Sequence, residues 1–330
     1  MIPESKLEPV NKALQLSFGT TELEDIKQLT KGLSSALVFR VVVLGKPYLL
    51  RVVTRTDAMA DPTSYYAAMK AGAGAGLAPH IYYMNTEDRI SITDFITESP
   101  FTIETAREQM PVIIRQLHSL PKFPKRLNYL DSADSFIEKF CAAKIFPESV
   151  TKDLFESYAR IGKVYPRNDE ANQVSSHNDV KPENIVFDGN RPWLIDWESA
   201  FLNDRYVDLS ILANFLIKTE KDEIDFLEKY FGEAADEYKL ARFFLMRQVL
   251  HMFYFTLLTV FAAGGQPIDV DSIRKYNFRE FHDGMWNGEI SLATNETRLQ
   301  YAWVHMQQLQ YNLQSKRLEE SLAIVSKHHL

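Results

Sequence analysis

The feature that most constrains the fold is a polar loop followed by two short apolar runs near the middle of the chain. Asn184 lies five positions after Asp179, and Asp196 lies twelve positions after Asn184. The runs Ile185–Phe187 and Trp193–Ile195 read as strands, and the Asp-Gly-Asn segment between them is typical of a hairpin turn. A hairpin would bring Asn184 and Asp196 to the same end of the strand pair, as two ligands of one metal ion require.

These residue types in this order predict phosphoryl transfer. That chemistry needs Mg²⁺ held by oxygen ligands and a carboxylate that orients the attacking hydroxyl. We assign the carboxylate role to Asp179 and the metal to Asn184 and Asp196. His177 would brace the loop, and Lys181 would reach the transferred phosphate. The order H-x-D-x-x-x-x-N, then a hairpin, then Asp, is that of a kinase catalytic loop.

The composition is that of an ordinary globular protein of 330 residues, with 45% apolar and 25% charged residues. A net charge of −7 argues against a nucleic-acid or anionic-membrane partner. The single cysteine, Cys141, excludes an internal disulfide, suits a reducing compartment and is expected to be buried. The N-terminus lacks a signal-peptide core, and Val249–Ala263 is too short to span a bilayer, so we expect a cytoplasmic protein without a membrane span.

The first part of the chain predicts a small lobe that binds a nucleotide. Two β-branched runs, 37–44 and 48–53, read as antiparallel strands after a small, polar loop. Backbone N–H groups of that loop and the hydroxyls of Ser34 and Ser35 would lie over phosphates. Arg51, a cation inside the second strand, is the candidate to grip phosphate oxygens.

The rest of this lobe follows from turn and strand signals. Asp61 precedes a proline and predicts a helix start, and runs at 81–83 and 90–96 read as strands. The lobe is thus complete by about residue 96. The segment 93–99 would be a hinge that faces an adenine, with Asp94 among the nucleotide-binding residues.

From Thr102 to the end the pattern is mostly helical. We therefore expect an α+β protein with two domains. Residues 1–96 would form a nucleotide-binding lobe with an antiparallel sheet, and residues 97–330 a larger, mostly helical lobe with the catalytic and acceptor-binding residues.

Residues 177–184 and 194–198, together with the small first lobe, resemble the aminoglycoside phosphotransferase and choline/ethanolamine kinase superfamily, which has a protein-kinase-like fold. The resemblance implies ATP and Mg²⁺, with Asp179 as catalytic base and with Asn184 and Asp196 on the metal. The His-Asn-Asp and Asp-Trp-Glu triplets and an arginine at position 51 favour the choline kinase-like branch.

The sequence departs from the family at the helix after Asp61. The expected glutamate partner of the strand cation is missing there, and Asp57 and Asp61 are the candidates to replace it beside Arg51, with the choice between them, or of neither, left open. A protein kinase is disfavoured, because Asn178 stands where many of those enzymes have arginine. Only eleven residues separate Asp196 from Asp208, too few to build a peptide-docking segment.

A small hydroxylated acceptor fits better, and the expected one is choline, ethanolamine or a related amino alcohol. Aromatic faces and carboxylates bind quaternary ammonium groups, and Trp197, Glu198 and Trp286 are the candidates. Two alternatives stay open: an aminoglycoside-type antibiotic as acceptor, and a nucleotide-binding protein without catalysis.

Overall fold

The computed structural model describes residues 2–29, 36–57, 60–264, 266, 268, 273 and 275–328. The chain folds into two compact units, each made of several segments. Unit 1 comprises residues 1–101, 119–124 and 179–201, and unit 2 comprises residues 102–118, 125–178 and 202–330. Residues 179–201 thus belong to unit 1, which the expected division at residue 96 did not include.

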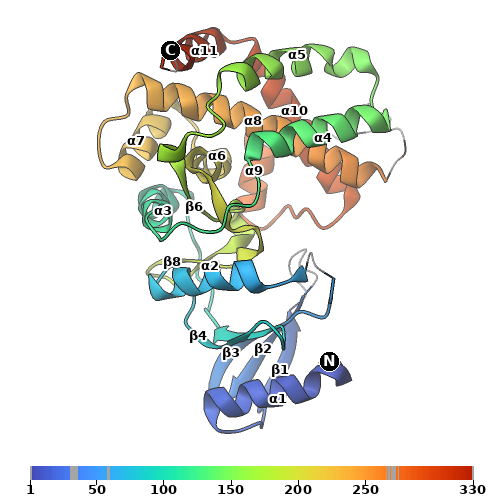
Figure 1. The fold of residues 1–330 in the computed structure, drawn as a ribbon, viewed down its shortest axis with the longest axis vertical. Helices are drawn as coiled ribbons and strands as arrows, with labels where there is room; N and C mark the ends of the chain where they lie inside the picture. Colours follow the sequence, from blue (N-terminus) through green and yellow to red (C-terminus); the bar gives the residue numbers. More distant parts are fainter. Residues whose placement is uncertain are drawn as a thin grey trace. The chain divides into compact units, whose positions relative to one another are not determined.

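Unit 1 is built on a five-stranded sheet with the order β1-β2-β3-β5-β4, in which all neighbours are antiparallel (Figure 1). Its strands are β1 (Asp25–Leu29), β2 (Leu37–Val43), β3 (Lys46–Val52), β4 (Ile81–Asn85) and β5 (Ile90–Asp94). Alternate side chains of β2 and β3 are buried, as expected when one face of a sheet packs on a core.

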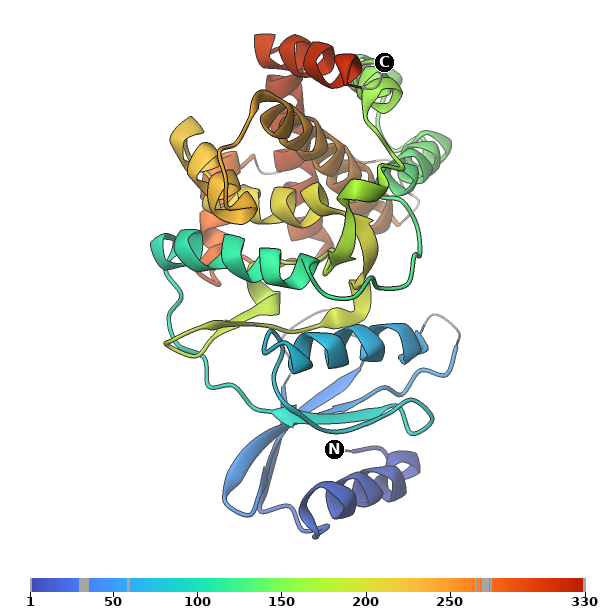
Figure 2. The same ribbon diagram turned by 60° about the vertical axis from the view of Figure 1, so that its left-hand side comes forward.

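The two faces of this sheet carry different helices (Figure 2). Helix α1 (Glu4–Phe18) covers the apolar face, where Leu14 packs with Leu50 and other core residues. Arg51 points to the opposite face because side chains alternate along a strand. There it lies near Tyr66 of α2 (Thr63–Gly74), whose side chain is buried.

A short hairpin completes unit 1. Strands β7 (Ile185–Phe187) and β8 (Pro192–Leu194) pair with Ile185 opposite Leu194. The Asp188 carboxylate accepts hydrogen bonds from the two backbone N–H groups that follow the turn glycine, each at 2.8 Å. At the open end, the N–H of residue 195 donates to the carbonyl oxygen of Asn184 at 3.0 Å. The predicted hairpin and its common end are confirmed.

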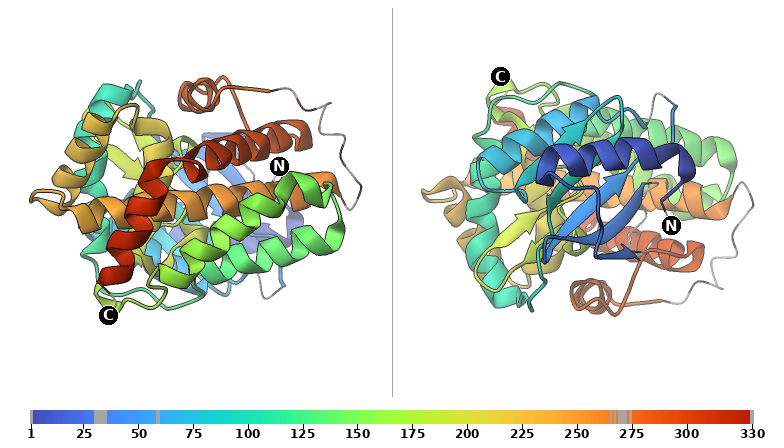
Figure 3. Two further views of the ribbon diagram at one scale, coloured as in Figure 1. Left: turned by 90° about the horizontal axis from the view of Figure 1, so that it is seen from above. Right: turned by 90° about the horizontal axis from the view of Figure 1, so that it is seen from below.

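Unit 2 is mostly helical and also contains a two-stranded sheet of β6 and β9. Its elements are α3 (Ile103–His118), α4 (Tyr129–Ala143), α5 (Glu148–Val164), β6 (Gln173–Ser176), β9 (Phe201–Asp204), α6 (Arg205–Leu216), α7 (Glu220–Phe231), α8 (Glu237–Ala263), α9 (Phe278–Trp286), α10 (Asn295–Leu313) and α11 (Lys316–Lys327). Figure 3 shows α8 running between the green helices α4 and α5 and the red helix α10, and α11 also packs against α8.

Helix α8 is the core helix of this unit. Among the described residues, it is the one helix long and apolar enough to cross a bilayer. In the structure, 67% of its most apolar 18-residue stretch is buried. It packs against α4, α5, α6, α10 and α11, so its apolar surface is covered by other helices of the unit. The apolar run from Val249 therefore belongs to a buried helix, as expected, although the helix begins earlier at Glu237.

The expected fold, a small antiparallel sheet followed by a larger helical part, is confirmed. The sequence did not indicate β1, whose residues are mostly exposed and lack an apolar alternation. The prediction of a buried Cys141 is wrong, because the thiol is exposed. The adjacent Phe140 takes the buried face of α4, and consecutive helical residues point in different directions.

Candidate active site

Two side chains of the polar loop converge on the carboxylate of a third loop residue in unit 1. The Oδ2 atom of Asp179 accepts hydrogen bonds from Lys181 Nζ and from Asn184 Nδ2, each at 2.8 Å. The same Asn184 amide donates to the backbone carbonyl oxygen of Asp179 at 2.8 Å. Burial alone would lower the pKa of Lys181, but the Asp179 carboxylate outweighs it and raises that pKa. Lys181 is therefore charged at neutral pH.

A second ion cluster joins β3 to the residues after β8. Arg51 Nη1 lies 3.3 Å from Asp196 Oδ1, and its Nη2 bonds to Glu198. Lys181 also interacts electrostatically with Asp196, which links this cluster to the Asp179 cluster. We call these six residues the loop cluster: Arg51, Asp179, Lys181, Asn184, Asp196 and Glu198.

The carboxylates that pair with Arg51 in the structure are Asp196 and Glu198, and the two candidates, Asp57 and Asp61, have other partners. Asp57 pairs with Arg55, and Asp61 accepts the backbone N–H of Thr63 at the start of α2. The carboxylate that the helix after Asp61 lacks is supplied by Glu198 instead. Glu198 was expected to contact the acceptor, and the structure places it against Arg51.

Asp196 has a left-handed backbone conformation, with φ 58° and ψ 65°. Few non-glycine residues adopt this conformation, and aspartate and asparagine tolerate it best. It lies directly before the short 3-10 helix Trp197–Ser199, so the chain turns sharply at this carboxylate. Strained residues of this kind cluster at functional sites, and here the strain falls on a predicted metal ligand.

The chemistry of Asn184 and Asp196 fits a magnesium ion. Asn184 uses its amide N–H on Asp179, and its carbonyl oxygen is the atom suited to a cation. Asp196 supplies a carboxylate that is 31% exposed. Across the described parts of the chain, no group of three or more His, Cys, Asp and Glu side chains is placed to hold a metal. Mg²⁺ usually takes one or two protein oxygens and completes its shell with phosphates and water.

Unit 2 anchors the start of the loop through the fully buried Asp208. Its carboxylate accepts the backbone N–H groups of His177 at 2.9 Å and Asn178 at 2.7 Å. The imidazole of His118 lies 3.0 Å from the same carboxylate and 2.7 Å from the Tyr230 hydroxyl. His177 is itself fully buried, which suits the predicted bracing role.

The remaining predicted site residues lie in different parts of the structure. Asp94 ends β5, and its carboxylate accepts the Tyr82 hydroxyl at 2.9 Å. The ring of Trp197 is buried, where it packs against Gly72 of α2 and donates its N–H to the carbonyl oxygen of residue 194. Trp286 lies in unit 2 at the end of α9. Ser34 and Ser35 lie outside the described residues.

Sequence reasoning missed the contribution of Asp208 and gave no role to Asn203, whose side chain donates to the Asn178 side chain at 2.7 Å. One signal was present. Asp208 is an acidic residue within the apolar start of a helix, and such a carboxylate is buried only when it is paired.

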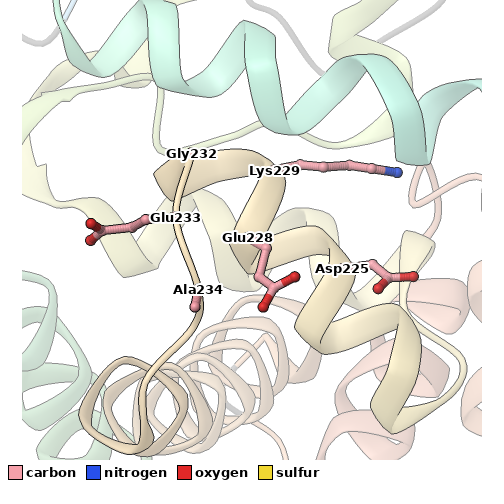
Figure 4. A pocket seen from close by; sticks show the side chains of 6 residues that line it. All are labelled: Asp225, Glu228, Lys229, Gly232, Glu233 and Ala234. Atoms are coloured by element: carbon pink, nitrogen blue, oxygen red, sulfur yellow. The ribbon is translucent and has the colours of Figure 1, made fainter.

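Two hollows lie on the surface of unit 2. The larger, of about 710 Å³, follows the end of α7 and is lined by Asp225, Glu228, Lys229, Gly232, Glu233 and Ala234. Its carboxylates point in different directions, and Lys229 pairs with Glu108 of α3 (Figure 4). The smaller, of about 220 Å³, lies between α3 and α7. Neither includes a residue of the loop cluster.

Comparison with known proteins identifies a family for this chain. The phosphotransferase enzyme family (APH) matches residues 25–244, which is 220 of the 330 residues. A search of curated proteins found no match.

Among solved structures, a choline/ethanolamine kinase family protein from Mesorhizobium loti has a TM-score of 0.67 at 19% identity, covering 96% of this chain and 98% of that one. An aminoglycoside phosphotransferase described as putative, from Ralstonia eutropha, has a TM-score of 0.61 at 14% identity, covering 91% and 98%. A spectinomycin phosphotransferase in complex with ADP and spectinomycin has a TM-score of 0.55 at 13% identity, covering 91% and 98%. At these identities the likeness shows the fold.

Proposed function

The chain belongs to the phosphotransferase enzyme family, and from this premise we propose that it transfers the γ-phosphate of ATP to a hydroxyl group of a small molecule. The observation that carries the proposal is the Asp179 carboxylate, held at 2.8 Å by both Lys181 and Asn184. A carboxylate fixed in this way can take a proton at a defined position, which is what an attacking hydroxyl requires.

The reaction has a simple balance. The acceptor oxygen forms a bond to the γ-phosphorus, the bond between that phosphorus and the bridging oxygen of ADP breaks, and the hydroxyl proton goes to Asp179. Lys181 holds Asp179 in place and offers positive charge to the transferred group, while His177 braces the loop.

The nucleotide site is part of the same proposal. Asn184 and Asp196 would hold Mg²⁺, and the ion supplies charge neutralisation on the phosphates when bound. Arg51 would grip phosphate oxygens, and Glu198 keeps its guanidinium in place. The loop with Ser34 and Ser35 would cover the phosphates, and the segment after Asp94 would face the adenine. The neighbour that is solved with ADP supports nucleotide use.

We propose choline, ethanolamine or a related amino alcohol as acceptor. The His-Asn-Asp triplet at 177–179, the Asp-Trp-Glu triplet at 196–198 and the solved choline/ethanolamine kinase family protein support this choice. Trp286 is the aromatic candidate for the cationic group. Trp197 is the weaker candidate because its ring is only 2% exposed. The antibiotic phosphotransferases among the neighbours keep an aminoglycoside as the second candidate.

The test is a screen of hydroxylated acceptors with ATP and Mg²⁺ that follows ADP release. We expect an amino alcohol to stimulate ADP release, and Asp179→Ala to reduce it by about 100-fold or more, since a general base contributes that much. Asp57→Ala, which removes an exposed carboxylate of unit 1, is the matched control and should keep the wild-type rate.

Three outcomes separate the candidates. Stimulation by aminoglycosides alone would move the acceptor to the second candidate. Nucleotide binding without stimulation by any acceptor would favour a non-catalytic protein. Equal rates for wild type and Asp179→Ala would remove Asp179 from the chemistry.

A further inference from the structure

We propose that Asn203 is a positioning residue for the loop that carries Asp179. Its side chain holds Asn178, the residue before Asp179, in a left-handed backbone conformation. The inference rests on the proposed function, because that function gives Asp179 its role in catalysis.

Asn178 is one of five described non-glycine residues with a positive φ, and its φ is 63°. This conformation costs free energy for most residues, and asparagine accepts it when its polar groups find partners. The backbone N–H donates to Asp208 at 2.7 Å, and the side-chain oxygen accepts from Asn203 at 2.7 Å. These two contacts fix different parts of one residue, and the peptide bond to Asp179 follows directly.

The Asn203 amide has a single usable orientation. Its Nδ2 donates to Asn178, and its Oδ1 accepts the backbone N–H of Asp204 at 2.9 Å. Turning the amide over would set an NH₂ group against that N–H and an oxygen against the Asn178 oxygen, so both hydrogen bonds would be lost. Asn203 is only 1% exposed, and water cannot easily replace either partner.

The residue next to Asn203 is anchored to the core helix of unit 2. The Asp204 carboxylate accepts from Arg242 Nη2 at 2.7 Å and from the Tyr165 hydroxyl at 3.1 Å, and it caps α6 through the N–H of Tyr206. Arg242 is fully buried in α8. A continuous polar path thus runs from α8 through β9 to Asn178, and Asn203 is its last link.

The kinetic test is a double-mutant cycle on Asn203 and Asn178. We expect Asn203→Ala to lower kcat by about 10- to 100-fold with an unchanged KM for ATP, because a small misplacement of a catalytic group costs rate. Asn178→Gly removes the accepting side chain and accepts a positive φ at no steric cost. We expect it to lower kcat too, and Asn203→Ala should then cause no further loss. Equal losses in both backgrounds would overturn the proposal, since Asn203 would then act elsewhere.

Hydrogen exchange gives a readout that needs no acceptor. Asn203→Ala should speed exchange of the Asn178 amide by about 10-fold or more, since that N–H is held only while the residue keeps its conformation. Asn312→Ala removes a similar amide donor, the one that bonds to Gln248 at 2.9 Å, and serves as control. Unchanged exchange in Asn203→Ala would also overturn the proposal. If wild type transfers phosphate to no acceptor, the proposed function fails while the exchange result still decides whether Asn203 positions the loop.

Discussion

Two clusters of ionisable side chains differ in burial and in charge. The loop cluster of unit 1 holds paired charges that keep contact with water, and the side chains of Asp179 and Lys181 are 26% and 27% exposed. The histidine cluster of unit 2 consists of His251, His282 and His305, all fully buried between α8, α9 and α10. The two Nδ1 atoms of His251 and His305 lie 2.8 Å apart.

Burial separates the protonation states of the two clusters. It lowers the pKa of His251 and His305 well below the ordinary value, and it lowers the pKa of His282 to about 3. Arg247 and Arg279 add repulsion that disfavours a charged imidazole. The histidines are therefore neutral at physiological pH, whereas Lys181 stays charged because its carboxylate partner outweighs desolvation. Under the proposed function, the loop cluster takes part in the chemistry and the histidine cluster does not.

The largest expected effect is that of the substitution Asp196→Asn in the loop cluster. It removes a charged ligand that Mg²⁺ would use, and metal charge stabilisation amounts to several kcal/mol. We expect phosphotransfer to fall by about 1000-fold and nucleotide binding to lose its dependence on Mg²⁺. Calorimetric titration with ATP, with and without Mg²⁺, measures the second effect.

Asp57→Asn provides the control for this change, because Asp57 is an exposed carboxylate of the same unit. The melting temperature should stay near that of wild type in both variants. If Asp196→Asn keeps Mg²⁺-dependent nucleotide binding, Asp196 is not in the metal site.

The second-largest expected effect is the loss of folding stability at acidic pH, which the histidine cluster causes. The folded pKa values lie below the ordinary 6.5, so the unfolded chain binds more protons and stability falls as pH drops below about 6.5. Each histidine contributes up to about 1.4 kcal/mol per pH unit, and the loss between pH 6.5 and 5.5 should be on the order of 3 kcal/mol. Urea unfolding at a series of pH values measures it.

This window lies above the range in which carboxylates normally protonate, so the histidines dominate it. Stability that stays flat between pH 6.5 and 5.5 would show that the cluster is charged or open to water in solution.

The sequence predicts the residues of the polar loop better than the residues that hold them in place. Local spacing groups Asp179, Asn184 and Asp196, because one loop and one hairpin set their distances. It does not give the partner of Arg51, since Glu198 lies 147 residues away in the chain. The contacts of Asn203 and Asp208 likewise depend on how distant helices pack, which no local pattern encodes.

The smallest expected effect is that of His305→Leu. It leaves His251 Nδ1 buried without its partner, which costs about 2 kcal/mol of unfolding free energy. We expect unchanged kcat at 25 °C, because His305 has no part in the proposed chemistry. The loss of unfolding free energy between pH 6.5 and 5.5 should become smaller by about one third, because one of three neutral histidines is gone. Tyr311→Leu, on the exposed part of the same helix, should alter neither quantity. A fall in kcat without a fall in stability would break the division between the two clusters and would assign a catalytic contribution to the buried histidines.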